Sequence, residues 1–251
     1  MPTPATRAGR LLLVPTPLAD VAETPLDSVL PQASIAAAAD LEHWIVENAK
    51  TARAFLGAVH AVQPLRVPLQ QHGMAVLPKH GRLDAAALRA MLQPCLDGAD
   101  MGLMSEAGAP CVADPGALVV AHAHELGIPV VPLVGPSALL LGLMASGLDG
   151  QRFAFHGYLP VEADARDGQI RLLERESAQR RQTQLFIETP YRNNAVLQAL
   201  IKTLKPSTRL TVASNLTSPH AAVHTRSVAQ WREANPTALE KVPCIFGFLA
   251  S

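Results

Sequence analysis

One segment in the middle of the chain constrains the fold most strongly, because its short apolar runs flank a loop and a helix-length stretch. Met101–Met104 predicts a buried strand, 105–116 a loop, 117–126 a helix and 128–133 a second strand. This order is typical of parallel α/β structure. Ligands of such sheets bind beyond the carboxyl ends of the strands, which is where the loop at 105–116 is expected to lie.

Other segments of the N-terminal half extend this pattern. The apolar run Leu11–Val14, ended by a proline, predicts a strand leading into a rigid loop. Apolar residues recur at helical spacing from Leu41 to Leu56, and a helix from Asp84 to Leu96 has Asp84 as its N-cap. A further apolar helix is expected between Ser137 and about Ser146. We therefore expect an open, mostly parallel α/β lobe.

The sequence after Gly150 predicts a second, mixed α/β lobe, whose strands are expected to be joined more often by turns than by helices. The boundary is placed at Gly150, which gives an N-terminal domain of residues 1–150 with cofactor loops and a C-terminal domain of residues 151–251. The expected elements are strands at 153–156, 185–188, 210–213, 222–228 and 244–249 and a charged helix at about 169–181.

The charges are unevenly divided, although the chain has 21 basic and 21 acidic residues in total. The part up to Gly150 has 8 Lys and Arg against 13 Asp and Glu, and the part after it has 13 against 8, so the halves carry −5 and +5. The imbalance is either a chance feature of solvated surfaces or the mark of a C-terminal half that attracts an anionic substrate.

The pattern of cysteines and the lengths of the apolar stretches exclude several classes of protein. Cys95, Cys111 and Cys244 are far apart and odd in number, so neither a disulfide framework nor a metal site is expected. Nothing near Met1 has the layout of a signal peptide, and no apolar stretch approaches the roughly 20 residues of a membrane helix. We expect a cytoplasmic protein without a membrane segment.

Three segments carry candidate chemistry. The loop 105–116 is rich in Gly, Ala and Pro, so its backbone can come close to a ligand, and it matches neither a phosphate loop nor a dinucleotide fingerprint. Ser137 is placed either to cap a helix or to donate to a ligand. A strand brings Glu188 and Arg192 to its carboxyl end, where the alternative to a binding role is a local ion pair.

These segments resemble one known family. "LLLVPTPLAD", "SEAGAPCVADPG", "PVVPLVGPSALLLGLMASGL", "FAFHGYLP" and "LFIETPYRN" occur in this order. The series is similar to the motifs of the tetrapyrrole methylases, S-adenosylmethionine-dependent methyltransferases, and within them to the branch that methylates ribose 2′-hydroxyls of small-subunit ribosomal RNA. The resemblance covers nearly the whole chain and implies two α/β domains with the cofactor in the cleft between them, a homodimer, and a role in rRNA processing.

The resemblance also implies which residues contact S-adenosylmethionine, largely through backbone groups. They are expected in three loops of the N-terminal lobe, which follow the strands at 11–14, 101–104 and 128–133, and in two segments of the C-terminal lobe. Carried over residue by residue, they are Pro17, Glu106, Ala107, Gly108, Val112, Pro136, Ser137, Ala138, Glu188, Asn215, Leu216 and Thr217.

The chain also departs from the motifs of the rRNA branch. That branch usually has Glu-Asp-Thr-Arg where this chain has Glu47, Asn48, Ala49 and Lys50, and Ala109 and Ala221 replace polar or charged family residues. Glu47 is retained and is the candidate catalytic residue, for positioning or proton transfer. The alternative for Glu47 is a carboxylate on a helix surface.

The methyl acceptor is expected to be anionic, with RNA favoured over a tetrapyrrole or another small polyanion. Scarce aromatic residues count against RNA, and the closer motif match counts for it. A third alternative is a cofactor-binding protein that has lost catalysis. The expected substrate-binding residues are Arg171, Arg175, Arg180, Arg181 and Arg192.

Overall fold

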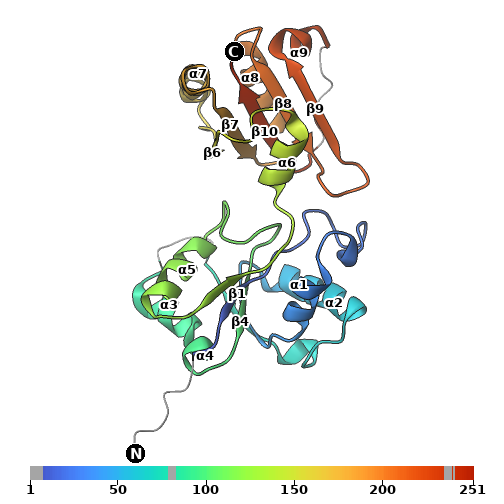
Figure 1. Ribbon diagram of the computed structural model, residues 1–251, viewed down its shortest axis with the longest axis vertical. Coiled ribbons are helices and arrows are strands. Elements are labelled where there is room, and N and C mark those ends of the chain that lie inside the picture. Colours follow the sequence, from blue (N-terminus) through green and yellow to red (C-terminus); the bar gives the residue numbers. More distant parts are fainter. Residues whose placement is uncertain (1–7, 79–82, 235–238, 240) are drawn as a thin grey trace, which may run out of the picture. The chain divides into compact units, whose positions relative to one another are not determined.

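The structure is a computed structural model of the 251-residue chain and describes residues 8–78, 83–234, 239 and 241–251. It divides into two compact units, Met1–Ser137 and Ala138–Ser251, and Figure 1 shows the elements of each. Each unit has its own sheet and its own hydrophobic core. The two α/β domains expected from the sequence are therefore present.

The sheet of the first unit is parallel at every strand pair among the described residues. Its order is β3-β2-β4-β1-β5. Because both faces of such a sheet are covered, its strands are nearly continuous apolar runs. The strands are β1 (Leu11–Leu13), β2 (His43–Val46), β3 (Gly73–Val76), β4 (Met101–Met104) and β5 (Val130–Pro132).

Helices cover both faces of this sheet (Figure 1). Successive strand residues point to opposite faces, so Trp44 packs with α1 and α2 whereas Ile45 packs with α3, α4 and α5. Asp84 caps α3 as predicted, because its Oδ1 accepts a hydrogen bond from Ala87 N at 2.7 Å. The helices are α1 (Gln32–Ala39), α2 (Ala49–Val62), α3 (Ala85–Met91), α4 (Gln93–Leu96) and α5 (Gly116–Glu125), with 3-10 turns at Leu26–Ser28 and Leu69–Gln71.

The second unit has a mixed sheet of order β6-β7-β10-β8-β9, in which only β6 and β7 pair in parallel among the described strands. Phe186, Phe246 and Phe248 form the centre of its core beneath three helices, and α6 packs against the opposite face. The elements are α6 (Ala138–Ser146), β6 (Phe153–Tyr158), α7 (Ala163–Arg180), β7 (Thr183–Glu188), α8 (Asn193–Thr203), β8 (Arg209–Ser214), β9 (Ala222–Ser227), α9 (Val228–Ala234) and β10 (Cys244–Leu249).

The helix predicted from Leu41 to Leu56 is wrong in its first part. Strand β2 occupies His43–Val46, and α2 begins only at Ala49, where the Asn48 side chain caps it by accepting from Lys50 N at 2.9 Å. The apolar spacing of a short buried strand followed by a helix resembles that of one longer helix, and pairing of β2 with β4 decides the outcome.

Two expectations for the C-terminal half are also corrected. Its strands are joined mainly by helices, since α7, α8 and α9 separate successive strands and the β8–β9 connection is a turn. The predicted boundary at Gly150 follows α6, whereas the compact units meet between Ser137 and Ala138. Helix α6 belongs to the second unit because it packs on β8, β9 and β10, and the Ser146 carbonyl accepts a hydrogen bond from Thr225 Oγ1 at 2.7 Å.

Candidate functional site

The loops after β1 and β4 are joined at the carboxyl edge of the first sheet. Thr16 and Gly108 form an isolated antiparallel bridge, with N–O distances of 3.0 Å from Thr16 N and 3.1 Å from Gly108 N. The Thr16 hydroxyl also donates to the Ser105 carbonyl at 3.4 Å. Because β1 and β4 are neighbouring parallel strands, this bridge brings the predicted residues Pro17 and Gly108 together.

Gly108 has a conformation and surroundings that suit glycine. Its φ of +77° lies in the left-handed region, and a Cβ atom there would lie 2.9 Å from Leu18 Cδ2 and 3.4 Å from the Pro136 carbonyl. Pro136 follows β5, so loops from β1, β4 and β5 meet at this glycine. The contact explains why the sequence has no side chain at position 108.

The loop after β2 reaches the same place through Glu47 and Asn48. Glu47 Oε1 accepts a hydrogen bond from Glu106 N at 3.2 Å, and Asn48 Nδ2 donates to Glu106 Oε1 at 3.1 Å. The alternative that Glu47 is a helix-surface carboxylate does not hold, because α2 begins at Ala49. Glu47 instead contacts the backbone of the candidate cofactor loop, while Glu106 and Ala107 are exposed.

The rest of the 105–116 loop is held by Asp114, a half-buried aspartate. Asp114 Oδ1 accepts a hydrogen bond from Gly116 N at 2.7 Å, whereas its buried Oδ2 has no hydrogen-bond partner. Burial raises the pKa of Asp114, against the opposing effect of backbone hydrogen bonds. Cys111 and Ala113 have φ values of 68° and 66°, so the loop around the exposed Val112 is conformationally constrained.

Two residues predicted to contact the cofactor, Ser137 and Ala138, lie at the boundary between the two units in the sequence. Ser137 ends the first unit, and Ala138 begins α6 in the second. The predicted roles of Ser137 in capping or ligand binding stay predictions, as does a cofactor contact of Ala138.

The predicted cofactor residues of the second unit lie at one edge of its sheet. Cys244, the first residue of β10, pairs with Glu188 on one side and with Ser214 on the other, so Glu188 and Asn215 flank it. Asn215 and Thr217 have φ values of 51° and 71°, and Asn215 N donates to the Pro243 carbonyl at 3.2 Å. Leu216 lies between these two residues in the sequence, and a role for the segment in cofactor binding stays a prediction.

Glu188 and Arg192 form a local ion pair, the alternative to a binding role. Arg192 Nη2 lies 3.1 Å from Glu188 Oε2, outside hydrogen-bond geometry, and the Glu188 side chain is 0% exposed. Arg192 Nη2 also donates to the Leu159 and Pro160 carbonyls at 3.2 and 3.1 Å. Arg192 therefore binds protein groups although its side chain is 25% exposed, and a ligand contact of Glu188 would have to come from its backbone.

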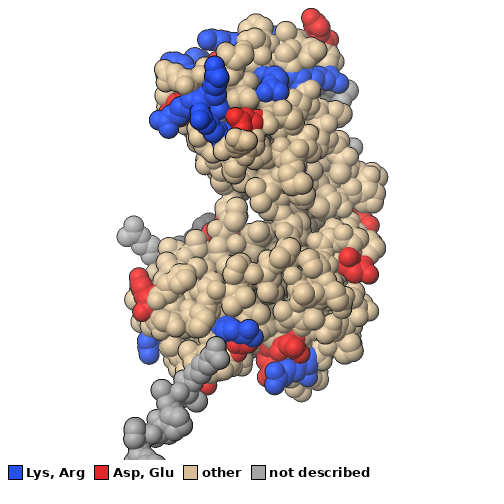
Figure 2. Space-filling model, viewed as in Figure 1, with Lys and Arg blue, Asp and Glu red and all other residues tan. Residues whose placement is uncertain are grey.

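The other predicted substrate-binding arginines lie on or next to α7. Figure 2 shows Lys and Arg side chains gathered over this helix. Arg171, Arg175, Arg180 and Arg181 are all exposed. Two acidic residues of the second unit, Glu174 and Glu188, are buried, so they add little negative charge to its surface. The exposed surface over α7 is accordingly cationic.

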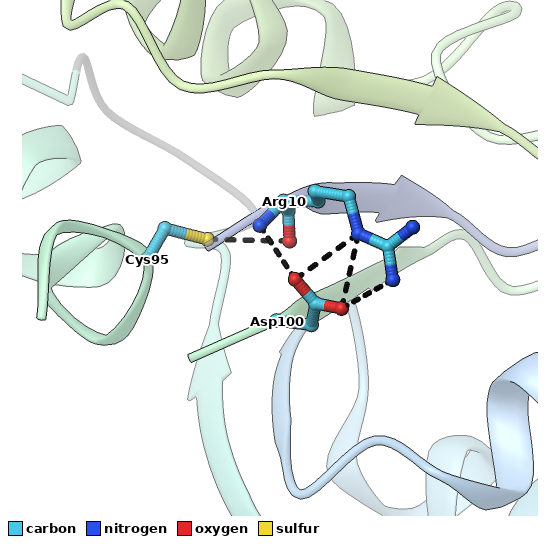
Figure 3. Close-up of polar contacts among 3 residues, drawn as sticks. All are labelled: Arg10, Cys95 and Asp100. Atoms are coloured by element: carbon cyan, nitrogen blue, oxygen red, sulfur yellow. Dashed lines mark hydrogen bonds and ion pairs between the residues drawn. The ribbon is translucent and has the colours of Figure 1, made fainter. Parts of the chain in front are cut away.

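A cavity of about 630 Å³ lies at the opposite, amino edge of the first sheet, away from these loops. Its lining includes Arg10, which donates to Asp100 through Nη2 at 2.6 Å, and Arg66, whose Nε lies 3.1 Å from Glu42 Oε1. Figure 3 shows Asp100 also accepting from Arg10 N, and Cys95 Sγ donating to the Arg10 carbonyl. These charged groups are paired with one another, so we assign no ligand to this cavity.

The cysteines are unbridged thiols. Burial raises the pKa values of Cys95 and Cys244 to about 11, and burial together with Asp114 raises that of Cys111 to about 12. They are protonated near neutral pH. Within the described part of the chain, no three His, Cys, Asp or Glu side chains are grouped to hold a metal ion, and no helix there could cross a membrane.

The fold and the loops define a class: a two-unit α/β protein whose candidate ligand loops meet at the carboxyl edge of a parallel sheet. The chain matches the sequence model of the tetrapyrrole (corrin/porphyrin) methylases over residues 29–231. It belongs to this family and is an S-adenosylmethionine-dependent methyltransferase. The family, the enzyme class and the cofactor predicted from the sequence are confirmed.

Curated relatives and solved structures agree with this assignment. The chain is 29% identical over 227 residues to ribosomal RNA small subunit methyltransferase I of Escherichia coli O157:H7, covering 88% of this chain and 70% of the relative. The protein of the same name in Mycobacterium bovis is 32% identical, with 86% and 69% covered. Among structures, the methyltransferase CobJ has a TM-score of 0.61 at 16% identity, covering 97% of this chain and 95% of its own.

A second structure has a bound ligand. It is uroporphyrin-III C-methyl transferase from Thermus thermophilus complexed with S-adenosyl homocysteine, with a TM-score of 0.56 at 15% identity, covering 96% of this chain and 97% of its own. At such identities the likeness of both structures establishes the fold alone.

Proposed function

We propose that this protein transfers the methyl group of S-adenosylmethionine to RNA of the small ribosomal subunit, at a ribose 2′-hydroxyl, in the cytoplasm. The observation that carries the proposal is the similarity to two ribosomal RNA small subunit methyltransferases I over 86–88% of the chain. The exposed arginines of α7 are its second support, because RNA binding depends on cations that neutralise phosphates.

The residues at the carboxyl edge of the first sheet fit the cofactor. Small residues at 107–109 leave backbone groups accessible, and the carboxylate of Glu106 suits a ligand with hydroxyl or ammonium groups. When bound, S-adenosylmethionine supplies an activated methyl group on a sulfonium, so the protein mainly has to align the acceptor. We propose that Pro17, Glu106, Ala107, Gly108, Val112 and Pro136 hold it, and that Glu47 positions Glu106.

The acceptor hydroxyl must lose its proton during methyl transfer. Glu47 Oε1 already accepts a hydrogen bond from Glu106 N. We therefore propose Glu47 as a positioning residue, and proton transfer to water or to a group of the substrate itself.

The second candidate acceptor is a tetrapyrrole. It is favoured by the TM-score of 0.56 with uroporphyrin-III C-methyl transferase, whose name states its acceptor. The arginines over α7 suit the carboxylates of a tetrapyrrole as well as phosphates, so charge does not separate the two. RNA ranks first because sequence similarity to the RNA enzymes is about twice as high.

The test is transfer of radiolabelled methyl from S-adenosylmethionine to small ribosomal subunits from cells that lack this protein, beside uroporphyrinogen. We expect label in the RNA and none in the porphyrin. Label only in the porphyrin would reverse the ranking. Cofactor binding without label in either acceptor would favour the third alternative, a protein that has lost catalysis.

We also propose a homodimer, as the family resemblance implies. Light scattering at micromolar concentration is expected to give twice the 26.6 kDa mass of the chain. A mass of 26.6 kDa would contradict this proposal.

A further inference from the structure

The aromatic side chain of Tyr191 is exposed to solvent, on a turn whose two ends are fixed by contacts with the rest of the protein. Its residue is 82% exposed, the highest value among the large hydrophobic side chains described as exposed. It follows β7 in a loop whose two ends are fixed by the buried Glu188 and by Arg192. Arg192 N also donates to the Thr189 carbonyl at 2.9 Å, which closes the turn.

A cation lies over this ring. Lys241 Nζ is 5.4 Å from the centroid of the Tyr191 ring, and Lys241 comes from the segment that leads into β10. A single exposed hydrophobic side chain is common on protein surfaces, but Tyr191 combines exposure with a fixed turn and an ammonium group beside its ring. A ring face with an adjacent ammonium is the chemistry that binds an unpaired base and its phosphate.

The second tyrosine of the chain leaves the sheet at the same edge. Tyr158 ends β6 and is 55% exposed. Because β6 and β7 are parallel and Tyr158 pairs with Ile187, the turn that carries Tyr191 follows the neighbouring strand end. Both tyrosines of this aromatic-poor chain are therefore displayed where strands of the second sheet end.

We propose that Tyr191 and Lys241 form a stacking site for an unpaired base of the RNA substrate, with the ring against the base and the ammonium on a neighbouring phosphate. This inference rests on the proposed function. One exposed ring is enough to hold one base, so the scarcity of aromatic residues does not count against an RNA substrate.

The test measures methyl transfer to small ribosomal subunits with the full-length protein. Tyr191→Ala is expected to raise KM for the RNA about ten- to a hundredfold, whereas Tyr191→Phe and Tyr191→Trp keep a ring and keep KM within about threefold. Lys241→Gln is expected to raise KM and to reduce the salt dependence of RNA binding. Val161→Ala, at a residue that is 70% exposed after the neighbouring strand β6, is the control and leaves KM unchanged.

Calorimetric binding of S-adenosylhomocysteine serves as the folding control and is expected to be the same in all variants. An unchanged KM in Tyr191→Ala would overturn the stacking site while leaving the proposed function intact. Equal losses in the Phe, Trp and Ala variants would overturn stacking in favour of a role for the hydroxyl. Wild-type protein that methylates no RNA would overturn the proposed function, and this site with it.

Discussion

Asn48 shows how one residue that departs from the family motif fits its neighbours. The rRNA branch usually has an aspartate at this position. Here the Asn48 amide donates to the Glu106 carboxylate at 3.1 Å while its oxygen caps α2. An aspartate could cap the helix equally well but would place a second carboxylate against Glu106. The departure is therefore compatible with an intact loop.

Gly108 is predicted to be indispensable for cofactor binding. Gly108→Val adds a Cβ 2.9 Å from Leu18 Cδ2 and places a β-branched residue at a φ of +77°. We expect the variant to lose the thermal stabilisation by S-adenosylhomocysteine, which for the wild type is about 2.7 kcal/mol at a hundredfold excess over Kd.

The matched control for this variant is Gly127→Val. Gly127 also has a positive φ, +69°, but nothing lies within 4 Å of its Cβ position. It is expected to lose similar stability and to keep the ligand-induced shift. A Gly108→Val protein that binds the ligand as the wild type does would refute the proposed loop site.

Glu47 is predicted to position the cofactor loop rather than to accept a proton. Glu47→Ala removes the acceptor for Glu106 N, and we expect S-adenosylhomocysteine binding to weaken about ten- to a hundredfold, as for a hydrogen bond to a charged group worth about 1.5–3 kcal/mol. Glu47→Gln keeps an acceptor oxygen, so its binding and kcat are expected to stay within a few fold of wild type. Normal binding with a greatly reduced kcat in Glu47→Gln would instead identify proton transfer.

The sequence indicated which loops form the candidate site, but not how these loops are connected. Small residues at 107–109 indicated a backbone site. The contacts of Thr16 with Gly108 and of Asn48 with Glu106 join residues 58 or more positions apart, which local patterns cannot reveal. The exposure of Tyr191 could not be predicted from the sequence either, because it depends on the contacts that fix the turn between Glu188 and Arg192.

At the scale of elements, strands with strong apolar character were predicted well and short or mixed ones were not. The strand β4 was expected with its bounds as found, and β10 likewise. The strand β3 is partly exposed and has four residues, so its sequence pattern is weak. The amphipathic helix α8 was missed between two strands, although its buried face forms much of the second core.

The pairing of β2 with β4 gives a prediction for stability. A Cβ on Gly102 would lie 2.4 Å from Trp44 Cζ3, and Trp44 is the residue paired with it. Trp44 is fully buried, so Gly102→Ala is expected to destabilise the protein by about 1–3 kcal/mol in urea unfolding.

Gly57→Ala is the matching control, because Gly57 is exposed in α2 with nothing within 4 Å of its Cβ position. It is expected to stabilise the protein by about 0.5–1 kcal/mol. An unchanged urea midpoint for Gly102→Ala would contradict the close packing of Gly102 on Trp44.

At the scale of the whole molecule, the division of charge is the property with the clearest consequence. The C-terminal half carries +5, and exposed arginines lie over α7 (Figure 2). Replacing both Arg180 and Arg181 by Glu is expected to weaken RNA binding and to make the negative slope of log K against log salt shallower by about one to two. Filter binding over a salt series measures this slope.

A charge-matched control distinguishes this surface from a general effect of net charge. Arg53 and Arg89 are exposed on helices of the first unit, α2 and α3. Replacing both by Glu changes the net charge equally and is expected to leave the slope unchanged. Equal effects of the two double variants on the slope would contradict a specific role of the α7 arginines in RNA binding.

The proposed methylation of small-subunit RNA can be tested directly in cells that normally make this protein. Nucleosides of small-subunit RNA are compared by mass spectrometry between cells with the protein, cells without it, and cells in which the wild-type or the Gly108→Val chain is restored. We predict that one ribose-methylated nucleoside is lost without the protein, returns with the wild-type chain and stays absent with Gly108→Val. An identical set of methylated nucleosides in all four samples would contradict the proposed methyl transfer to small-subunit RNA.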